Sequence, residues 1–102
     1  MIHCAIIGVG QIGSRHLQAL CHLEEQTRVD LVDPSDESLQ TARSRYEQVI
    51  SAGKQDTKLY CHHSLDGLPD TLDIVLIATN SVVREKVIRD VIQKRSVKNL
   101  IL

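Results

Sequence analysis

IHCAIIGVGQIGSRHLQALCHLEEQTRVDLVD, residues 2–33, decides the fold of this chain. An apolar run over His3–Ile7 ends at a glycine-rich turn, and apolar residues at helical spacing follow over residues 11–25. The three glycines have the spacing G-x-G-x-x-G and are Gly8, Gly10 and Gly13. A strand, a glycine turn and a helix in this order are typical of a βαβ unit that binds a dinucleotide.

Each glycine has a separate task in such a turn. Gly8 permits the tight turn out of the strand, Gly10 lets a pyrophosphate approach the backbone, and Gly13 lets the helix pack closely on the sheet. Backbone N–H groups at the start of the helix would face the anion, helped by the helix dipole. The predicted phosphate loop consists of Gly8, Val9, Gly10, Gln11, Ile12 and Gly13. The alternative is a turn that only joins strand to helix, and the surrounding pattern favours the cofactor.

Asp33 follows the second apolar strand, Val29–Val32, at about the 20-residue distance expected of a ribose-binding acid. A carboxylate there accepts both ribose hydroxyls of NAD and repels the 2′-phosphate of NADP. The next three residues, Pro34, Ser35 and Asp36, carry no positive charge. Asp33 would also suit a cap of the next helix; the ribose role is favoured, and the two roles are compatible. The sequence therefore favours NAD as the cofactor.

The rest of the chain alternates helices with strands. The expected elements are a helix that opens at Pro34 and Ser35 and stops at Gly53, a strand over Lys58–Cys61, a loop over Ser64–Thr71 with one helical turn, a buried strand over Asp73–Ala78, a helix capped by Ser81 that ends near Arg95, and a strand over Val97–Leu102. The expected buried stripes of the two helices are Leu39, Ala42, Tyr46, Val49 and Ile50, and Val83, Val87, Ile88 and Val91.

This alternation predicts one α/β domain over residues 1–102, a doubly wound parallel sheet of the Rossmann type. The expected strand order is 3-2-1-4-5. A crevice then opens beyond the carboxyl ends of strands one and four, where the order reverses.

Composition and charge exclude several other classes of protein. The net charge of −1 provides no excess positive charge that would attract nucleic acid or anionic lipid. No apolar run approaches the roughly 20 residues of a membrane span, and no signal sequence precedes the first strand. Three cysteines without CxxC spacing fit reduced thiols, so we expect a cytoplasmic protein.

Histidines and cysteines near strands one and three do not predict a metal site, because strand two would separate them. These residues are His3, Cys4, Cys61, His62 and His63. His62 and His63 lie near the expected adenine end of the cofactor, but a solvated loop is the favoured interpretation.

Two further stretches carry a family resemblance. The phosphate loop continues into Arg15, His16, Leu17, Ala19 and Leu20, and residues 74–84 read IVLIATNSVVR. The chain therefore resembles the Gfo/Idh/MocA oxidoreductases, whose members begin G-x-G-x-I-G-x-x-H-x-x-A-L and carry an A-T-[PN] loop after strand four. The resemblance implies that Ala78, Thr79 and Asn80 lie along the cofactor towards the nicotinamide ribose. Arg84 stands where many members have histidine.

The resemblance also sets expectations about function. In the family, strand five leads into Glu-Lys-Pro, whose lysine works beside the substrate, and this chain ends where that motif would begin. Lys98 lies inside the strand, so no catalytic residue is assigned. We expect the cofactor-binding domain of an NAD-dependent oxidoreductase acting on a sugar-like or polyol hydroxyl, inactive alone, with an open strand-five edge that favours self-association. The alternatives are a non-catalytic regulatory or sensor module that binds a dinucleotide, and a Rossmann fold with an impaired site.

Overall fold

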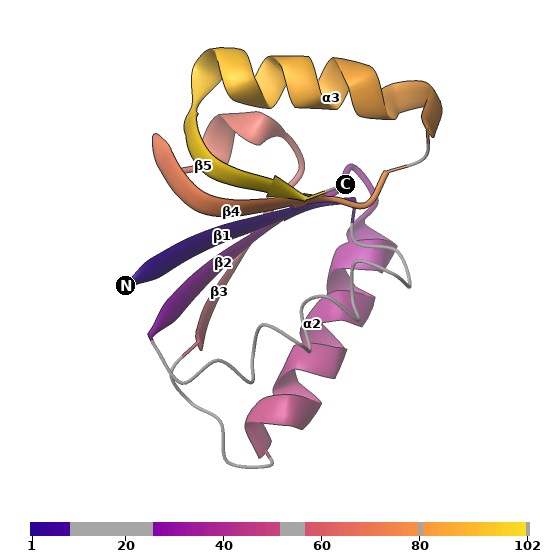
Figure 1. The fold of residues 1–102 in the computed structure, drawn as a ribbon. Coiled ribbons are helices and arrows are strands. Elements are labelled where there is room, and N and C mark those ends of the chain that lie inside the picture. The colour runs from indigo at the N-terminus through magenta and orange to yellow at the C-terminus, as the bar shows by residue number, and fades with distance from the viewer. Residues whose placement is uncertain (9–25, 52–56, 80, 102) are drawn as a thin grey trace.

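The computed structural model describes residues 1–8, 26–51, 57–79 and 81–101. One sheet of five parallel strands has the order β3-β2-β1-β4-β5, which confirms the predicted topology (Figure 1). The strands are β1 (Ile2–Ile7), β2 (Thr27–Val32), β3 (Thr57–His62), β4 (Thr71–Ile77) and β5 (Ser96–Ile101). The expected strands shift by no more than two residues at either end. Leu102, the expected end of strand five, lies outside the described residues.

Helices lie on both sides of the sheet. Helix α2 (Asp36–Ser51) covers one face, and α3 (Ser81–Lys94) covers the other together with the single 3₁₀ turn η1 (Leu65–Gly67) (Figure 1). The turn inside the predicted loop is therefore confirmed. The helix expected over residues 11–25 and the stop at Gly53 lie outside the described residues.

The starts of the two described helices differ slightly from expectation. Ser35 precedes α2, and its Oγ accepts a hydrogen bond from the Ser38 N–H at 3.3 Å, which is the geometry of an N-cap. Ser81, by contrast, is the first residue of α3 and not the residue before it. The prediction that Ser81 stands before the helix as its cap is therefore wrong.

The core has two halves, one on each face of the sheet. Alternate residues of β1 point to opposite sides, with Cys4 and Ile6 towards α2 and Ala5 and Ile7 towards α3. Because both faces are covered, the central strands are continuous apolar runs and do not alternate with polar residues. Burial of each methylene contributes about 0.8 kcal/mol, so this two-sided core is the main source of stability.

The predicted helical stripes are largely confirmed. Leu39, Ala42 and Val91 are buried, while Tyr46, Val87 and Ile88 are partly buried against the two core halves. Val83 departs from the prediction, because 43% of it is exposed. The side chains of Val49 and Ile50 lie outside the described part. Within that part, no helix is both long and apolar enough to cross a bilayer.

One carboxylate connects three strands. Asp73 in β4 accepts a hydrogen bond from the His3 backbone N–H of β1 at 2.8 Å, and Lys98 Nζ of β5 lies 3.2 Å from its other oxygen. The His3 N–H, followed by the Lys98 ammonium, holds the pKa of Asp73 below its ordinary value. Both contacts favour the charged form, so Asp73 stabilises the fold while it is ionised.

This arrangement predicts an acid-sensitive contribution to stability. A carboxylate with a lowered folded-state pKa contributes fully above its ordinary value of about 3.9, and its contribution is lost as pH falls through the lowered value. We expect Asp73→Asn to lower the urea midpoint at pH 7, measured by circular dichroism. The difference in urea midpoint between the variant and the original chain should then shrink progressively as pH falls below about 4. A difference that stayed constant down to acid pH would contradict this role.

Candidate functional site

The loops after β1, β2 and β4 leave the same edge of the sheet. Backbone hydrogen bonds continue beyond the strand ends, from Gly8 N–H to the Val32 carbonyl at 2.8 Å and from Ala78 N–H to the Ile7 carbonyl at 2.8 Å. The Asp33 N–H donates to the His62 carbonyl at 3.0 Å. These bonds bring Gly8, Asp33 and Ala78 to one carboxyl edge, as the strand order predicts.

Gly8 occupies a position that only glycine fits. Its φ is +84°, in the left-handed region, and a Cβ built there would lie 2.9 Å from Thr79 Cγ2 and 3.0 Å from the Thr79 backbone nitrogen. The first glycine of the predicted loop therefore permits the turn and also the close approach of the β4–α3 loop. The other predicted loop residues, Val9, Gly10, Gln11, Ile12 and Gly13, lie outside the described residues, as does Asn80.

Asp33 stands directly after β2 and is half-buried. Its Oδ1 accepts the Ser35 N–H at 2.8 Å, which forms an Asx turn. The N-cap of α2 is Ser35, so the alternative reading of Asp33 as the helix cap is wrong. The Asx turn fixes the carboxylate at the edge of the sheet, beside Gly8.

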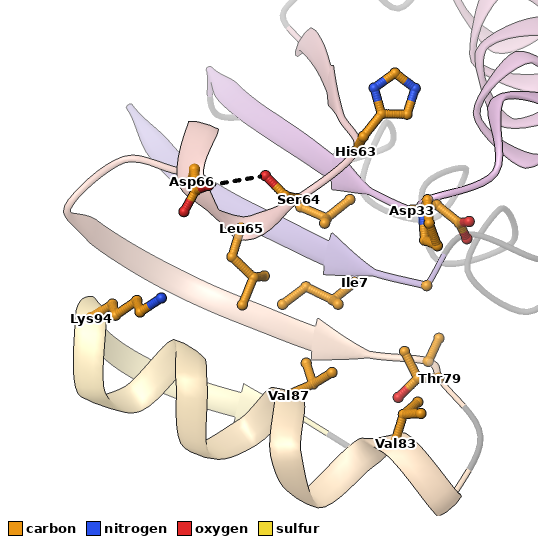
Figure 2. Close-up of a pocket in the computed structure, with 14 residues that line it drawn as sticks. Ile7, Asp33, His63, Ser64, Leu65, Asp66, Thr79, Val83, Val87 and Lys94 are labelled. Carbon is orange, nitrogen blue, oxygen red and sulfur yellow. Dashed lines mark hydrogen bonds between the residues drawn. The ribbon is translucent and has the colours of Figure 1, made fainter.

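A pocket of about 650 Å³ opens between η1 and α3 (Figure 2). Ile7 and Val32 contribute apolar lining. Leu65 of η1 faces Val87 of α3 across the pocket. The residues at its rim come from the carboxyl edge and are Gly8, Asp33, Pro34, Ala78 and Thr79. The described members of the predicted site therefore line one cavity.

The walls of this pocket were not among the predicted site residues. Val83 and Val87 are one helical turn apart on α3, and both line the cavity. This explains why Val83 stays exposed although it belongs to the apolar stripe. The sequence did place Val83, an apolar residue, at the start of a helix beside the expected crevice. That position could have indicated a pocket wall, but a residue of the buried core has the same helical spacing.

Two buried polar atoms near the rim lack a partner. Among the described residues, Thr79 Oγ1 and Arg84 Nε are buried without a hydrogen bond, although Arg84 Nη2 donates to the Thr79 carbonyl at 3.2 Å. A buried polar atom without a partner costs about 1–3 kcal/mol, so such atoms point to a missing ligand or water. Thr79 also lines the pocket, so a dinucleotide bound there would supply the partner that its Oγ1 lacks.

His62 and His63 have different environments. His63 is among the residues that line the pocket, and its ring contacts the Asp36 carboxylate, with 64% of the side chain exposed. His62 contradicts the expectation of a solvated loop, because it ends β3 and its Nε2 lies 2.7 Å from Oδ1 of the buried Asp30.

Asp30 is the centre of a charged cluster that sequence reasoning missed. It is 0% exposed, and both its oxygens accept hydrogen bonds from Arg28, at 3.0 and 3.1 Å. The Arg28 guanidinium also stacks on Tyr60, 4.2 Å from the ring centroid. Asp30 and Arg28 are two residues apart in β2 and therefore share a face. This spacing could have predicted from the sequence that the two side chains pair. Asp30 is buried while Arg28 is partly exposed, so removal of Arg28 would leave a buried carboxylate with fewer partners and would destabilise the fold.

The cysteines and histidines near strands one and three do not converge. The described residues contain no group of three or more His, Cys, Asp or Glu side chains placed to hold a metal. Strand β2 lies between β1, which carries Cys4, and β3, which carries Cys61. Burial raises the pKa of the Cys4 thiol to about 11, so this thiol is inert at neutral pH.

Comparison with known proteins agrees with this geometry. None of the curated proteins compared with the chain matches it. A family model described as an oxidoreductase family with an NAD-binding Rossmann fold matches residues 2–101, nearly the whole chain. The chain therefore belongs to the Gfo/Idh/MocA oxidoreductase family and is an NAD(P)-binding Rossmann domain of that family.

Proposed function

We propose that this chain binds NAD in preference to NADP. The observation that carries the proposal is Asp33, which the Asx turn holds at the rim of the pocket directly after β2. A carboxylate there accepts hydrogen bonds from ribose hydroxyls and repels a 2′-phosphate. Asp36 adds a second negative charge nearby, in contact with His63. Lys94, the one cation among the described lining residues, is on the last turn of α3, far from this rim.

The pocket suggests where each part of the cofactor lies. The base fits between Leu65 of η1 and Val83 and Val87 of α3, where the lining is apolar. The adenosine ribose faces Asp33, and the pyrophosphate follows the glycine loop that begins at Gly8. The nicotinamide half extends along Ala78, Thr79 and Asn80, where Thr79 Oγ1 would gain a partner. When bound, NAD supplies the hydride acceptor, and these residues bind and orient it.

We further propose that residues 1–102 act as the cofactor-binding domain of a cytoplasmic oxidoreductase whose substrate carries a sugar-like or polyol hydroxyl. The family membership supports oxidoreduction. The substrate class is what the resemblance to the Gfo/Idh/MocA oxidoreductases implies. The edge strand β5, with Ile101 49% exposed, supports self-association of this chain, which light scattering would detect.

Titration of the chain with NADH and with NADPH, followed by the fluorescence of the reduced nicotinamide, tests the cofactor proposal. A hydrogen bond to a charged group contributes about 1.5–3 kcal/mol, so we expect NADH to bind at least about tenfold more tightly. Equal affinities, or tighter binding of NADPH, would overturn the assignment of Asp33. If neither NADH nor NADPH bound to the chain, the proposed cofactor-binding function itself would be overturned.

A further inference from the structure

The two walls of the pocket come from separate crossovers of the chain. Leu65 and Asp66 belong to η1, which connects β3 to β4, and Val83 and Val87 belong to α3, which connects β4 to β5. A single 3₁₀ turn has too few internal hydrogen bonds to hold its own position, and its last carbonyls need partners from elsewhere. The width of the pocket therefore depends on whatever connects η1 to α3.

Arg95, the residue after α3, makes that connection. Its Nε donates to the Leu68 carbonyl at 3.2 Å, and its Nη2 donates to the carbonyls of Leu65 at 3.2 Å and Asp66 at 3.4 Å. Its Nη1 donates to the Lys94 carbonyl at 3.0 Å, and its backbone N–H donates to the Val91 carbonyl at 2.9 Å. One guanidinium thus joins the end of α3 to the carbonyl groups of η1.

The end of η1 at Gly67 rests on His62. A side chain at Gly67 would collide with the His62 ring, so the ring and the turn are in direct contact. The contact with the buried Asp30 in turn fixes the position of this ring. With η1 supported by His62, Arg95 supplies the hydrogen bonds that join η1 to the end of α3, in addition to the apolar packing of Leu65 and Leu68 in the same core half.

We propose that Arg95 is a positioning residue that sets the width of the base-binding part of the pocket, and thereby its selectivity for a purine. This inference rests on the proposed binding of NAD. Arg95 does not line the pocket and acts through Leu65 and Asp66, whose carbonyls it holds. The planar guanidinium has five donors in a fixed arrangement, whereas an ammonium on a flexible stem cannot serve the same carbonyls together.

Calorimetric titration with NAD and with nicotinamide cytosine dinucleotide tests the inference, because the two differ in the size of the base. In the original chain we expect NAD to bind about tenfold more tightly, since the smaller pyrimidine leaves a gap between the walls. In Arg95→Ala we expect NAD to bind about tenfold more weakly and the preference for it to fall to about twofold, with Arg95→Lys in between.

Arg89→Ala is the matched control. Arg89 lies on the same helix, is exposed, and pairs with Glu85 one turn earlier, away from the pocket lining. We expect this variant to keep both affinities. A purely structural role of Arg95 would weaken both dinucleotides by the same factor, and that result, or unchanged affinities, would overturn the inference.

A cofactor-free measurement separates this inference from the proposed function. The Leu68 N–H donates to the Leu65 carbonyl at 3.1 Å and closes η1. We expect hydrogen exchange at Leu68 to accelerate at least tenfold in Arg95→Ala compared with Arg89→Ala. Equal exchange in the two variants would overturn the positioning role. The original chain could fail to bind NAD while hydrogen exchange is still faster in Arg95→Ala. That result would overturn the proposed function and the base selectivity that rests on it. It would support only the link that Arg95 makes between η1 and α3.

Discussion

Substitution of Gly8 by alanine is expected to remove cofactor binding and to destabilise the fold by about 2–4 kcal/mol. The backbone of Gly8 has a φ of +84°, which L-residues rarely adopt. The added Cβ would also lie 2.9 Å from Thr79 Cγ2 and 3.1 Å from the Ala78 carbonyl carbon. Both effects push apart the two loops that form the rim of the pocket. Urea unfolding and NADH titration of Gly8→Ala measure the two consequences.

A double variant separates the crowding from the backbone strain. Thr79→Ser removes the Cγ2 atom that the new Cβ would meet first, but leaves the backbone of Thr79, 3.0 Å away, and the unfavourable φ. We expect Gly8→Ala with Thr79→Ser to recover less than half of the lost stability. Full recovery would show that φ at Gly8 costs nothing, and normal NADH binding by Gly8→Ala alone would show that the turn serves only to join strand and helix.

The second large effect is expected at Asp33. Asp33→Asn should weaken NADH binding about tenfold or more and should tighten NADPH binding, so that the preference between the cofactors is lost. The asparagine retains an Oδ1 that can accept the Ser35 N–H, so the Asx turn that begins the approach to α2 is preserved. Only the negative charge is removed, and fluorescence titration with both cofactors measures the result.

Asp33→Ala serves as the comparison, because it removes both the charge and the turn. If the charge carries the selectivity, Asn and Ala lose the NADH preference alike, while Ala alone lowers the urea midpoint. If NADH binding survives in Asp33→Asn and fails in Asp33→Ala, the Asx turn and not the charge is the important feature. That second pattern would contradict the role of Asp33 in cofactor choice.

Several features of the fold follow from short stretches of sequence. The glycine turn after His3–Ile7, the apolar strand over residues 73–78 and the alternation of helix and strand predict the parallel sheet and its order, which the structure confirms. These signals are local, because periodicity and turn glycines depend on neighbouring residues. Because the crossovers between parallel strands are right-handed, few strand orders are possible for such a sheet. The placement of Gly8, Asp33 and Ala78 at one edge follows from that topology alone.

Other features depend on contacts between distant segments. Asp30 reads as one polar residue in an apolar strand, but it is buried, and one of its partners, His62, is 32 residues away in the chain. Likewise, Val83 reads as a core residue but lines the pocket, and Arg95 reads as the end of a solvated helix but donates to carbonyls 27 to 30 residues earlier.

The sequence by itself determined the fold class, the strand order and the edge at which the cofactor is expected to bind. Only the tertiary structure decided which side chains form the walls of the pocket and which residues hold those walls in place. The physical reason is that hydrogen bonds to carbonyl groups and the burial of a carboxylate leave no periodic pattern in the sequence. Any exposed arginine or polar strand residue has the same local signature until the chain is folded.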